Sequence, residues 1–401
     1  MDKKTVRDID VDGKRVLVRA DLNVPLNGGV GVITDDNRIR ATLSTIKYLI
    51  NRGARIILIS HLGRPKGKVV DELRLTVVAQ RLSQILGQQV GVATDCIGPE
   101  VEKSVENLKS GDVLLLENLR FHSDEETGSS SFAQALARLG DVFVNDAFGT
   151  SHRAHASIAV IAHYLPAVAG LLLEKEIKTL GGILENPACP FTALLGGAKV
   201  SDKVGMLENI MGKVGCLLIG GGMAATFLKA SSYEVGLSLI EVDRVGTAVS
   251  LMEKATKNEV RLLLPVDVII ADGLSSEAHA EAVSVEDIPE DKRVVDIGPQ
   301  TIANFREELQ SSKTVFWNGP VGIHEIPQFA AGTQAMAGFL ANLDATTIIG
   351  GGSTAEVVDD LGLAGRMTFV STGGGASLRF LSGETLPGVE TLLEKETNSG
   401  G

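Results

Sequence analysis

The stretch RIRATLSTIKYLINRGARIILIS (38–60) decides the fold class of this chain. Its first part, 38–53, places apolar residues on one helical face and ends in a glycine, as an amphipathic helix does. The residues on that face are Ile39, Leu43, Ile46, Leu49 and Ile50. The rest, RIILIS (55–60), is typical of a buried strand, and a similar run, RVLV (15–18), precedes the helix. This order of strand, helix and strand predicts a βαβ unit and therefore a parallel sheet.

The same alternation continues along both halves of the chain. Further strands of the first half are predicted at VGVA (90–93), VLLLE (113–117) and VFVN (142–145). The second half contains apolar runs that end in glycines, namely FTALLGGAK (191–199), CLLIGGGM (216–223), VFWNGPVG (315–322), TIIGGGST (347–354) and FVSTGGGAS (369–377). Helical patterns follow these runs. The chain is therefore predicted to be an α/β protein with two doubly wound, mainly parallel-sheet, Rossmann-like domains.

A helical stripe in the middle of the chain marks the expected domain boundary. The 401 residues exceed the size at which one hydrophobic core usually stops growing, so two domains are expected. The apolar residues of the stripe are Leu173, Ile177, Leu180 and Leu184. The predicted divisions are an N-terminal domain at 1–168, an interdomain hinge helix at 169–186, a C-terminal domain at 187–383 and a tail at 384–401. The tail sequence leaves open which domain it packs on, and a return to the N-terminal domain is one option.

The composition of the chain disfavours a membrane protein, a secreted protein and a nucleic-acid-binding protein. No apolar run reaches the roughly 18 residues that a membrane span needs, and the start, MDKKTVRDID, lacks the hydrophobic segment of a secretory signal. Cys96, Cys189 and Cys216 lie far apart without C-x-x-C spacing, which is typical of buried or incidental thiols in a reducing compartment. The net charge of −12 disfavours nucleic acid as a partner. We expect a cytoplasmic protein that binds neither membranes nor nucleic acid.

Cationic side chains follow several of the predicted strands in the first part of the chain. They are Arg19, Arg38, His61, Arg64, Arg120 and Arg153. In an open α/β sheet the ligand crevice lies outside the carboxyl ends of the strands, so these side chains are expected to meet at one edge. The guanidinium fork matches phosphate and carboxylate oxygens bidentately. The pattern predicts an anion site, although each residue taken alone is more typical of a surface or salt-bridged position.

The glycine-rich strand ends of the second half indicate phosphate binding. Without Cβ atoms, such loops let backbone N–H groups approach phosphate oxygens. The motif G-x-x-x-x-G-K-[ST] is absent, so the chain is not a P-loop enzyme by sequence. Two looser matches to a dinucleotide fingerprint, which begin at Gly220 and Gly350, keep a nicotinamide-dependent oxidoreductase open as an alternative.

Two lysines in GGAKVSDK (196–203) point to the same class of ligand. A helix is predicted to start near Ser201, which would put Lys203 in its first turn and Lys199 just before it. Lysines at that end of a helix oppose the macrodipole, which favours anions there. An anion bound between the lysines and the helix would remove that cost. The alternative is a pair of solvated surface lysines.

Eight motifs occur in an order that resembles the phosphoglycerate kinase family. They are VRADLNVPL, SHLGRP, LLENLRFH, NDAFGTSHRAHAS, LLGGAKVSDK, FWNGPVG, GGGST and STGGGAS, and they span most of the chain. The resemblance implies a monomeric, two-lobed glycolytic kinase. Such an enzyme transfers a phosphoryl group reversibly between 1,3-bisphosphoglycerate with ADP and 3-phosphoglycerate with ATP, and Mg²⁺ is expected to accompany the nucleotide.

The resemblance also implies roles for individual residues. The phosphoglycerate site of the N-terminal lobe is expected to contain Asp21, Asn23, Arg38, His61, Arg64, Arg120 and Arg153. The residues expected to act on the transferring phosphoryl group are Arg38, Lys199, Gly373 and Gly374. The nucleotide site of the C-terminal lobe is expected to contain Gly196, Gly197, Lys203, Gly220, Gly221, Gly298, Asn318, Pro320, Glu325, Gly351, Gly352, Ser353 and Thr354. Within it, Glu325 is expected to contact the ribose.

One position departs from the family pattern. The family usually has GGGD where this chain has GGGS, and the Asp of that motif helps to hold magnesium. A hydroxyl such as that of Ser353 is a poorer magnesium ligand than a carboxylate, and Asp359 lies about 9 Å farther along a helix. We expect the metal to be held mainly by nucleotide phosphates, water and Thr354. The change also keeps open a catalytically silent protein that binds phosphorylated metabolites.

The resemblance implies that the two lobes close on their substrates. Phosphoryl transfer demands alignment and charge neutralisation, and the carboxylate acceptor needs no general base. Substrates held by separate lobes must come within about 3–3.5 Å of each other for attack, and water must be kept from the labile acyl phosphate. We expect closure around 166–190 that requires both ligands.

Overall fold

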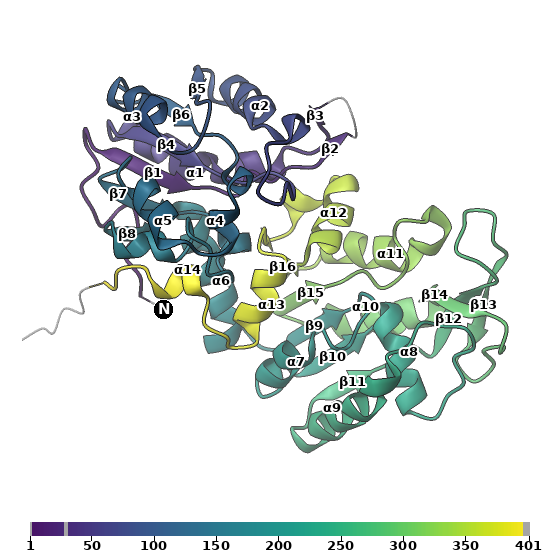
Figure 1. Ribbon diagram of the computed structural model, residues 1–401. Helices are drawn as coiled ribbons and strands as arrows, with labels where there is room; N and C mark the ends of the chain where they lie inside the picture. The colour runs from purple at the N-terminus through teal and green to yellow at the C-terminus, as the bar shows by residue number, and fades with distance from the viewer. Residues whose placement is uncertain (1, 28–30, 396–401) are drawn as a thin grey trace, which may run out of the picture. The chain divides into compact units, whose positions relative to one another are not determined.

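The chain folds into two compact units, Met1–Lys178 with Thr385–Gly401, and Thr179–Glu384. The structure is a computed structural model that describes residues 2–27 and 31–395 (Figure 1). We call the two parts the first unit and the second unit; the division between them falls inside helix α6 (Leu171–Glu185). None of the helices in the described ranges combines the length and the apolar character that crossing a membrane requires.

A six-stranded parallel sheet lies at the centre of the first unit. Its strand order is β5-β6-β4-β1-β7-β8. The strands are β1 (Arg15–Arg19), β4 (Arg55–Ile59), β5 (Val90–Val92), β6 (Val113–Leu115), β7 (Val142–Asn145) and β8 (Ala167–Ala169). This unit also contains the antiparallel pair β2 (Leu26–Asn27) and β3 (Val32–Ile33), and the helices α1 (Asn37–Asn51), α2 (Thr76–Leu86), α3 (Pro99–Glu106), α4 (Ser123–Glu126), α5 (Ser130–Ala137) and α14 (Pro387–Glu390).

The core of the first unit explains its sequence pattern. Val16 and Val18 of β1 and Ile56 and Leu58 of β4 are fully buried, because helices cover a parallel sheet on both faces. The apolar stripe of α1, which includes Ile46, packs into the same core. The five predicted strands and the helix predicted at 38–53 are therefore confirmed to within two residues at each end. Strand β8 was not predicted, since two of its three residues are alanine, which is depleted in strands.

The second unit repeats the same plan. Its sheet has the order β11-β10-β9-β15-β16-β17, again with every neighbouring pair parallel. The strands are β9 (Phe191–Leu195), β10 (Cys216–Ile219), β11 (Arg261–Leu263), β15 (Thr314–Asn318), β16 (Thr346–Gly350) and β17 (Phe369–Val370). The helices are α7 (Val204–Ile210), α8 (Gly221–Ala230), α9 (Val245–Lys257), α10 (Pro299–Gln310), α11 (Ala331–Leu340), α12 (Gly352–Asp360) and α13 (Gly375–Leu381). The predicted fold class, two mainly parallel α/β sheets, is confirmed.

A small antiparallel sheet in the second unit was not predicted. It consists of β12 (Asp267–Ala271) between β13 (Ala280–Ser284) and β14 (Arg293–Ile297). No residue of β13 is fully buried, so the strand lacks the apolar run by which the buried strands were recognised. Antiparallel sheets tolerate one solvated face, so their strands need not be continuous apolar runs.

The part of the C-terminal tail that the structure describes, which ends at residue 395, packs on the first unit; residues 396–401 of the predicted tail lie outside the described residues. The backbone N–H of Lys4 donates to the carbonyl of Leu393, and the N–H of Leu393 donates to the carbonyl of Ala167, with N···O distances of 2.7 and 2.9 Å. In Figure 1, α14 lies in yellow beside the first unit, close to the N-terminus. The tail therefore joins the beginning of the chain to β8.

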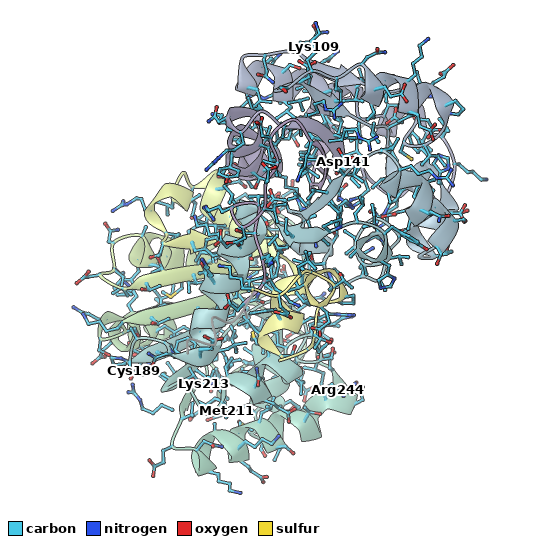
Figure 2. All side chains as sticks on the ribbon, turned by 90° about the vertical axis from the view of Figure 1, so that its left-hand side faces the viewer. Lys109, Asp141, Cys189, Met211, Lys213 and Arg244 are labelled. Carbon is cyan, nitrogen blue, oxygen red and sulfur yellow. The ribbon has the colours of Figure 1, made fainter. Side chains whose placement is uncertain are left out.

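The three cysteines are all free thiols. Cys96 and Cys216 are buried, whereas Cys189 is exposed (Figure 2). Burial raises the pKa of the Cys216 thiol to about 12, which keeps it protonated and unreactive near neutral pH.

A buried carboxyl group supports the start of α6. Asp146 is fully buried, and its Oδ1 accepts hydrogen bonds from the backbone N–H groups of Leu172 and Leu173, at 2.9 and 3.2 Å. These amides belong to the first turn of the helix, which has no intrahelical acceptors for them. Burial raises the pKa of Asp146 from 3.8 to about 7.

Replacing Asp146 by asparagine should therefore change how stability depends on pH. The raised pKa means that the contribution of Asp146 to stability is complete below about pH 4 and is lost as pH rises through about 7. Between about pH 4 and pH 7 this shift corresponds to a loss of about 4 kcal/mol in the free energy of unfolding. Asp146→Asn does not titrate but can still accept the amide hydrogen bonds, so the variant should gain stability relative to the parent as pH rises.

Urea unfolding of the parent and of Asp146→Asn measures the stability difference between them. The two conditions are about pH 5 and about pH 8, which span most of the titration of Asp146. A stability difference that is the same at both pH values would contradict the assignment. The other buried carboxyl with a raised pKa, Asp296, is present in both proteins and cancels in the comparison.

Candidate functional site

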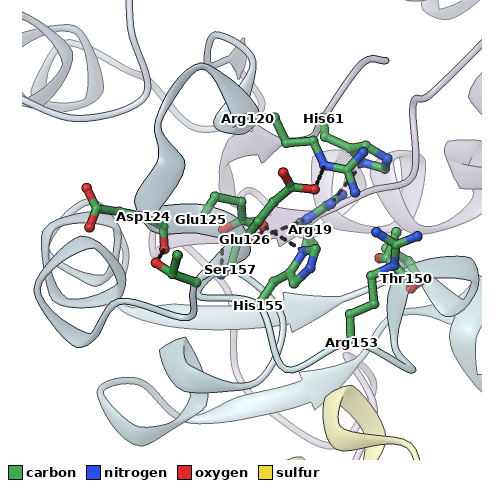
Figure 3. A network of polar contacts seen from close by, with 12 residues as sticks. Arg19, His61, Arg120, Asp124, Glu125, Glu126, Thr150, Arg153, His155 and Ser157 are labelled. Carbon is green, nitrogen blue, oxygen red and sulfur yellow. Dashed lines mark hydrogen bonds and ion pairs between the residues drawn. The ribbon is translucent and has the colours of Figure 1, made fainter. Parts of the chain in front are cut away.

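The carboxyl ends of the strands in the first unit carry the predicted cations. Arg19 is the last residue of β1, and His61 follows β4 by two residues. Arg120 lies in a 3-10 turn, Leu119–Phe121, beyond β6, and Arg153 follows β7. Parallel strands place their carboxyl ends at one edge of the sheet, so separate stretches of sequence deliver these side chains to one place. Figure 3 shows all four side chains at this edge.

The cations are close enough to perturb one another. Burial lowers the pKa of His61 well below its usual range, so the imidazole is neutral. Nearby arginines lower that pKa further, in the order Arg19, Arg120, Arg38 and Arg153. Burial likewise lowers the pKa of Arg120, with Arg153 and Arg64 adding to the effect against the opposing Glu126 and Glu125. Such a concentration of positive charge is complementary to a ligand with several negative charges.

Hydrogen bonds hold the loops of this edge together. Arg38, in the first turn of α1, donates to the carboxylate of Asp21. Asn23 Oδ1 accepts the backbone N–H of Gly63 at 2.8 Å, and Arg120 Nη1 donates to the carbonyl of Gly63 at 2.9 Å. Gly63 has a φ of +63°, where other residues are strained. The turn of SHLGRP therefore depends on this glycine, and the loop after β1 and the turn after β6 both bind to it.

Two of the predicted cations remain accessible. Arg64 is exposed, and Arg153 is partly buried, with Nε donating to Nε2 of His152 at 3.3 Å. The six cations predicted for an anion site thus lie at one edge of the first unit, together with Asp21 and Asn23, which the family resemblance adds to the set.

Backbone contacts among glycine loops form the corresponding edge of the second unit. The N–H of Gly197, after β9, donates to the carbonyl of Pro320, after β15, at 2.7 Å. The N–H of Gly221, after β10, donates to the carbonyl of Val321 at 3.0 Å. A Cβ on Gly196 would stand 2.1 Å from the oxygen of Pro320, and a Cβ on Gly221 would stand 2.6 Å from the nitrogen of Gly197. The three loops can approach this closely only because glycine, which has no side chain, stands at the points of contact.

One lysine borders these loops from within. Lys203 is 6% exposed, and its Nζ lies 3.2 Å from where a Cβ of Gly197 would be. Burial lowers the pKa of Lys203, and Asp202 partly offsets the effect. Lys199 is exposed. Helix α7 begins at Val204, so the prediction that the helix starts near Ser201 and has Lys203 in its first turn is wrong; the residues from 196 to 203 form a loop and turns instead.

Asn318 and Thr354 lie beneath the loops. Asn318 is the last residue of β15 and is 2% exposed, and its Nδ2 has no hydrogen-bond partner in the described part of the chain. A buried donor left unpaired is costly, so Nδ2 fits an acceptor supplied by a ligand. Thr354 is fully buried, and its Oγ1 accepts the N–H of Gly319 at 2.7 Å. Thr354 therefore supports the loop after β15.

The remaining predicted residues occupy several places in the second unit. Gly351, with a φ of +88°, precedes α12, while Gly352 and Ser353 form its exposed start. Gly373 donates its N–H to Ser371 Oγ at 3.0 Å, and Gly374, with a φ of +50°, precedes α13.

Gly298 and Glu325 have local partners of their own. Gly298 joins β14 to α10, where a Cβ would stand 2.2 Å from Cγ of Asp267. Close packing against Asp267 therefore accounts for this glycine. Glu325 is exposed, with Oε2 3.2 Å from Nδ1 of His324. Its carboxylate is open to solvent and can accept hydrogen bonds from hydroxyl groups of a ligand.

Comparison with known proteins identifies the family. The family model described as phosphoglycerate kinase matches residues 6–384. The chain is 53% identical to the phosphoglycerate kinase of Pelotomaculum thermopropionicum and 52% identical to that of Moorella thermoacetica; each alignment covers 98% of this chain and 100% of the relative. The chain belongs to the phosphoglycerate kinase family. This result confirms the resemblance carried by the eight motifs, and the nicotinamide-dependent oxidoreductase considered as an alternative is wrong.

Solved structures agree with the assignment to the phosphoglycerate kinase family. The phosphoglycerate kinase of Coxiella burnetii matches with a TM-score of 0.86 and 41% identity, covering 97% of this chain and 98% of that one. The enzyme of Pyrococcus horikoshii matches with a TM-score of 0.84 and 30% identity over the same shares. The fold of both units is therefore that of the phosphoglycerate kinases.

The buried layer behind the cations of the first unit was not predicted from the sequence. Glu125 is fully buried and accepts hydrogen bonds from the N–H and the Oγ of Ser157, at 2.9 and 2.6 Å. Ser157 Oγ in turn accepts from Nε of Arg19 at 3.0 Å (Figure 3). In the sequence, Glu125 stands in the acidic run SDEE and resembles a surface residue. Nothing in the spacing distinguishes it from its exposed neighbours.

Proposed function

We propose that the first unit binds 3-phosphoglycerate or 1,3-bisphosphoglycerate and that the second unit binds ADP or ATP. The enzyme transfers a phosphoryl group reversibly between the two, as the phosphoglycerate kinase family does. The observation that carries the assignment of sites is the difference between the two sheet edges: one presents side-chain cations, and the other presents glycine backbone with a buried lysine. Phosphoglycerate has anionic groups at both ends, which the cations of the first unit can bind. Nucleotide phosphates accept hydrogen bonds from backbone N–H groups, which the glycine loops of the second unit provide.

In the first unit, the chemistry required is orientation and charge neutralisation. The acceptor carboxylate is ionised near neutral pH, so no residue has to remove a proton from it. Arg38 is the cation proposed to meet the transferring group, and Asp21 orients its guanidinium through the hydrogen bond between them. Arg64 and Arg153 are proposed to bind the phosphate that stays on the glycerate. His61, Arg120 and Asn23 complete the site.

In the second unit, the glycine loops and Lys203 are proposed to hold the nucleotide. The wall of the adenosine pocket would consist of Gly196, Gly220 and Pro320. Glu325 would accept hydrogen bonds from the ribose hydroxyl groups. The unpaired Nδ2 of Asn318 and the N–H groups of 351 and 352 would donate to phosphate oxygens. Lys199 and the loop at 373 and 374 would stabilise charge on the transferring group. Each proposed site consists of residues of one chain, so a monomer is sufficient for activity.

The residues at the start of α12 fit a nucleotide phosphate better than they fit magnesium. Ser353 offers a hydroxyl where a carboxylate is the preferred ligand of Mg²⁺, and Thr354 Oγ1 is already the acceptor for Gly319. We therefore propose that the metal is held by phosphate oxygens of the nucleotide and by water, and that its contribution is to neutralise phosphate charge.

Restoring a carboxylate at this position should tighten binding of the metal–nucleotide complex. Ser353→Asp adds an anionic oxygen ligand at an exposed site, where nothing has to move to admit it. Calorimetry should show a lower Kd for Mg-ADP, whereas metal-free ADP should bind no better, because the added charge repels it. Ser353→Asn has a similar size without the charge and is the control. An unchanged Kd for Mg-ADP in Ser353→Asp would contradict the proposal.

Closure of the two units is proposed to require both ligands. Each site attracts its own ligand, and the reactive atoms must then approach within about 3–3.5 Å. Small-angle X-ray scattering should show a smaller radius of gyration with 3-phosphoglycerate and a non-hydrolysable ATP analogue together than with either alone. The same radius of gyration in all states would refute ligand-dependent closure.

A coupled assay tests the proposed reaction directly. ATP, magnesium and 3-phosphoglycerate should yield an acyl phosphate whose enzymatic reduction consumes NADH. A catalytically silent phosphometabolite-binding protein, the alternative that Ser353 keeps open, would bind 3-phosphoglycerate but consume no NADH in this assay.

A further inference from the structure

Arg19 is a buried cation that has no direct access to a ligand. Its residue is 1% exposed, at the end of the central strand β1. Each nitrogen of its guanidinium has a partner: Nε donates to Ser157 Oγ at 3.0 Å, Nη1 donates to the carbonyl of Ala20, and Nη2 lies 3.1 Å from Nδ1 of His61. Figure 3 shows Arg19 between Ser157 and His61. A residue enclosed in this way acts on substrate only through another residue.

The contact with Arg19 determines where His61 carries its proton. A guanidinium has five N–H donors and no acceptor, so Nδ1 of His61 must accept in this contact. Burial and the surrounding cations, Arg120, Arg38 and Arg153 as well as Arg19, keep the imidazole neutral by lowering its pKa. A neutral imidazole carries one proton, and with Nδ1 as acceptor that proton must reside on Nε2. His61 is therefore a neutral donor from Nε2.

A chain of directed hydrogen bonds holds Arg19 in place. Glu125 is fully buried and accepts from both the N–H and the hydroxyl of Ser157, so the hydroxyl proton of Ser157 points to Glu125. The same Ser157 oxygen is thus left with lone pairs for Nε of Arg19. The negative charges of Glu125 and Asp21 stabilise the charged form of Arg19, which burial alone would disfavour. Donors and acceptors alternate without conflict from Glu125 to His61.

We propose that Arg19 is a positioning residue that fixes His61 as the Nε2–H tautomer, so that His61 donates a hydrogen bond to an anionic oxygen of the glycerate substrate. This inference rests on the proposed role of His61 in the phosphoglycerate site. The tautomer itself can be measured without substrate, so a failure of the inference can be told apart from a failure of the proposed function.

Nitrogen-15 NMR of the imidazole rings in the ligand-free enzyme is the first test. The signals of His61 are those missing from the His61→Gln variant, among seven histidines. The expected result is an unprotonated Nδ1 and a protonated Nε2 at about pH 7, with no change toward the charged form down to about pH 6. A His61 that is protonated on Nδ1, or charged at that pH, would overturn the proposal.

A double-mutant cycle is the second test, and it separates positioning from general support of the fold. Arg19→Met should raise the KM for 3-phosphoglycerate about 10- to 100-fold, as expected for losing a hydrogen bond to a charged ligand. His61→Gln places an amide N–H near the position of Nε2–H, and that donor does not depend on a tautomer. In the His61→Gln background, Arg19→Met should therefore raise the KM by less than about threefold. Equal effects in both backgrounds would show that Arg19 has only a structural role.

Two further variants complete the comparison. Arg19→Lys keeps a donor and a positive charge, so its KM should lie between those of the parent and Arg19→Met. Arg15→Met is the matched control: Arg15 lies at the opposite end of β1, where it pairs with Asp141 at 2.6 Å, and its replacement should leave the KM unchanged (Figure 2 labels Asp141). If Arg19→Met does not fold, the NMR experiment on the parent still decides the tautomer.

Discussion

Replacing Arg38 by alanine is expected to lower kcat at least about 1,000-fold, the scale on which a cation that stabilises a transferring phosphoryl group acts. The dissociation constant of ADP should stay nearly unchanged. Arg38 belongs to the first unit, where it is partly exposed and bound to Asp21, whereas the residues proposed for the nucleotide belong to the second unit. Stopped-flow or coupled assays give kcat, and calorimetry gives the affinity for ADP.

Arg40 provides a matched control for this experiment. It lies on the same helix two residues away, is exposed, and pairs with Asp36 at 2.7 Å. Arg40→Ala should leave kcat within about twofold of the parent, because exposed ion pairs contribute little. Near-normal turnover in Arg38→Ala would remove Arg38 from the mechanism. Arg38→Lys should be intermediate, since lysine supplies the charge without the bidentate fork.

Replacing Gly221 by alanine is expected to weaken ADP binding about 10- to 100-fold. Gly221 has a φ of +65°, and a Cβ there would stand 2.6 Å from the nitrogen of Gly197 and 2.7 Å from the oxygen of Pro320. Strain of this kind costs about 1–3 kcal/mol, and relieving it would push the glycine loops apart. Calorimetry with ADP measures the effect, and binding of 3-phosphoglycerate should not change.

Gly338→Ala is the control for the glycine substitution. Gly338 lies in α11, and a Cβ added there would meet no other part of the described chain within 4 Å, so alanine should be tolerated or slightly stabilising. If Gly221→Ala binds ADP as tightly as the parent, the close approach of the three loops is irrelevant to nucleotide binding.

Much of the fold could be predicted because its strands are buried on both faces. Continuous apolar runs such as VFVN (142–145) and CLLI (216–219) admit few other interpretations once helical patterns separate them. Weak local signals account for the failures. Two of the three residues of β8 are alanine, and β13 is half solvated, so neither carries a strand pattern of its own. Their pairing is decided by neighbours that are distant in the sequence.

The site could be predicted in part for a similar reason. Polar residues directly after buried strands, such as His61 after β4, must lie at the ligand edge of a parallel sheet, whatever the conformation of the loops. The contacts behind them follow from tertiary packing alone. Glu125, Ser157 and the support that Thr354 gives to Gly319 depend on which loops meet, and a single sequence does not contain that information. The start predicted for α7 was too early because the N–H and the hydroxyl of Ser201 donate to Glu241, which is distant in the sequence, and residues 201–203 form turns.

We propose above that each unit binds one of the two reactants. A crystal structure of the enzyme with 3-phosphoglycerate and a non-hydrolysable ATP analogue tests it most directly. We expect 3-phosphoglycerate on the first unit, with its phosphate on Arg64 and Arg153 and its carboxylate toward Arg38, and nucleotide phosphates over Gly197, Gly221 and Asn318 of the second unit. Both ligands bound within a single unit would contradict it.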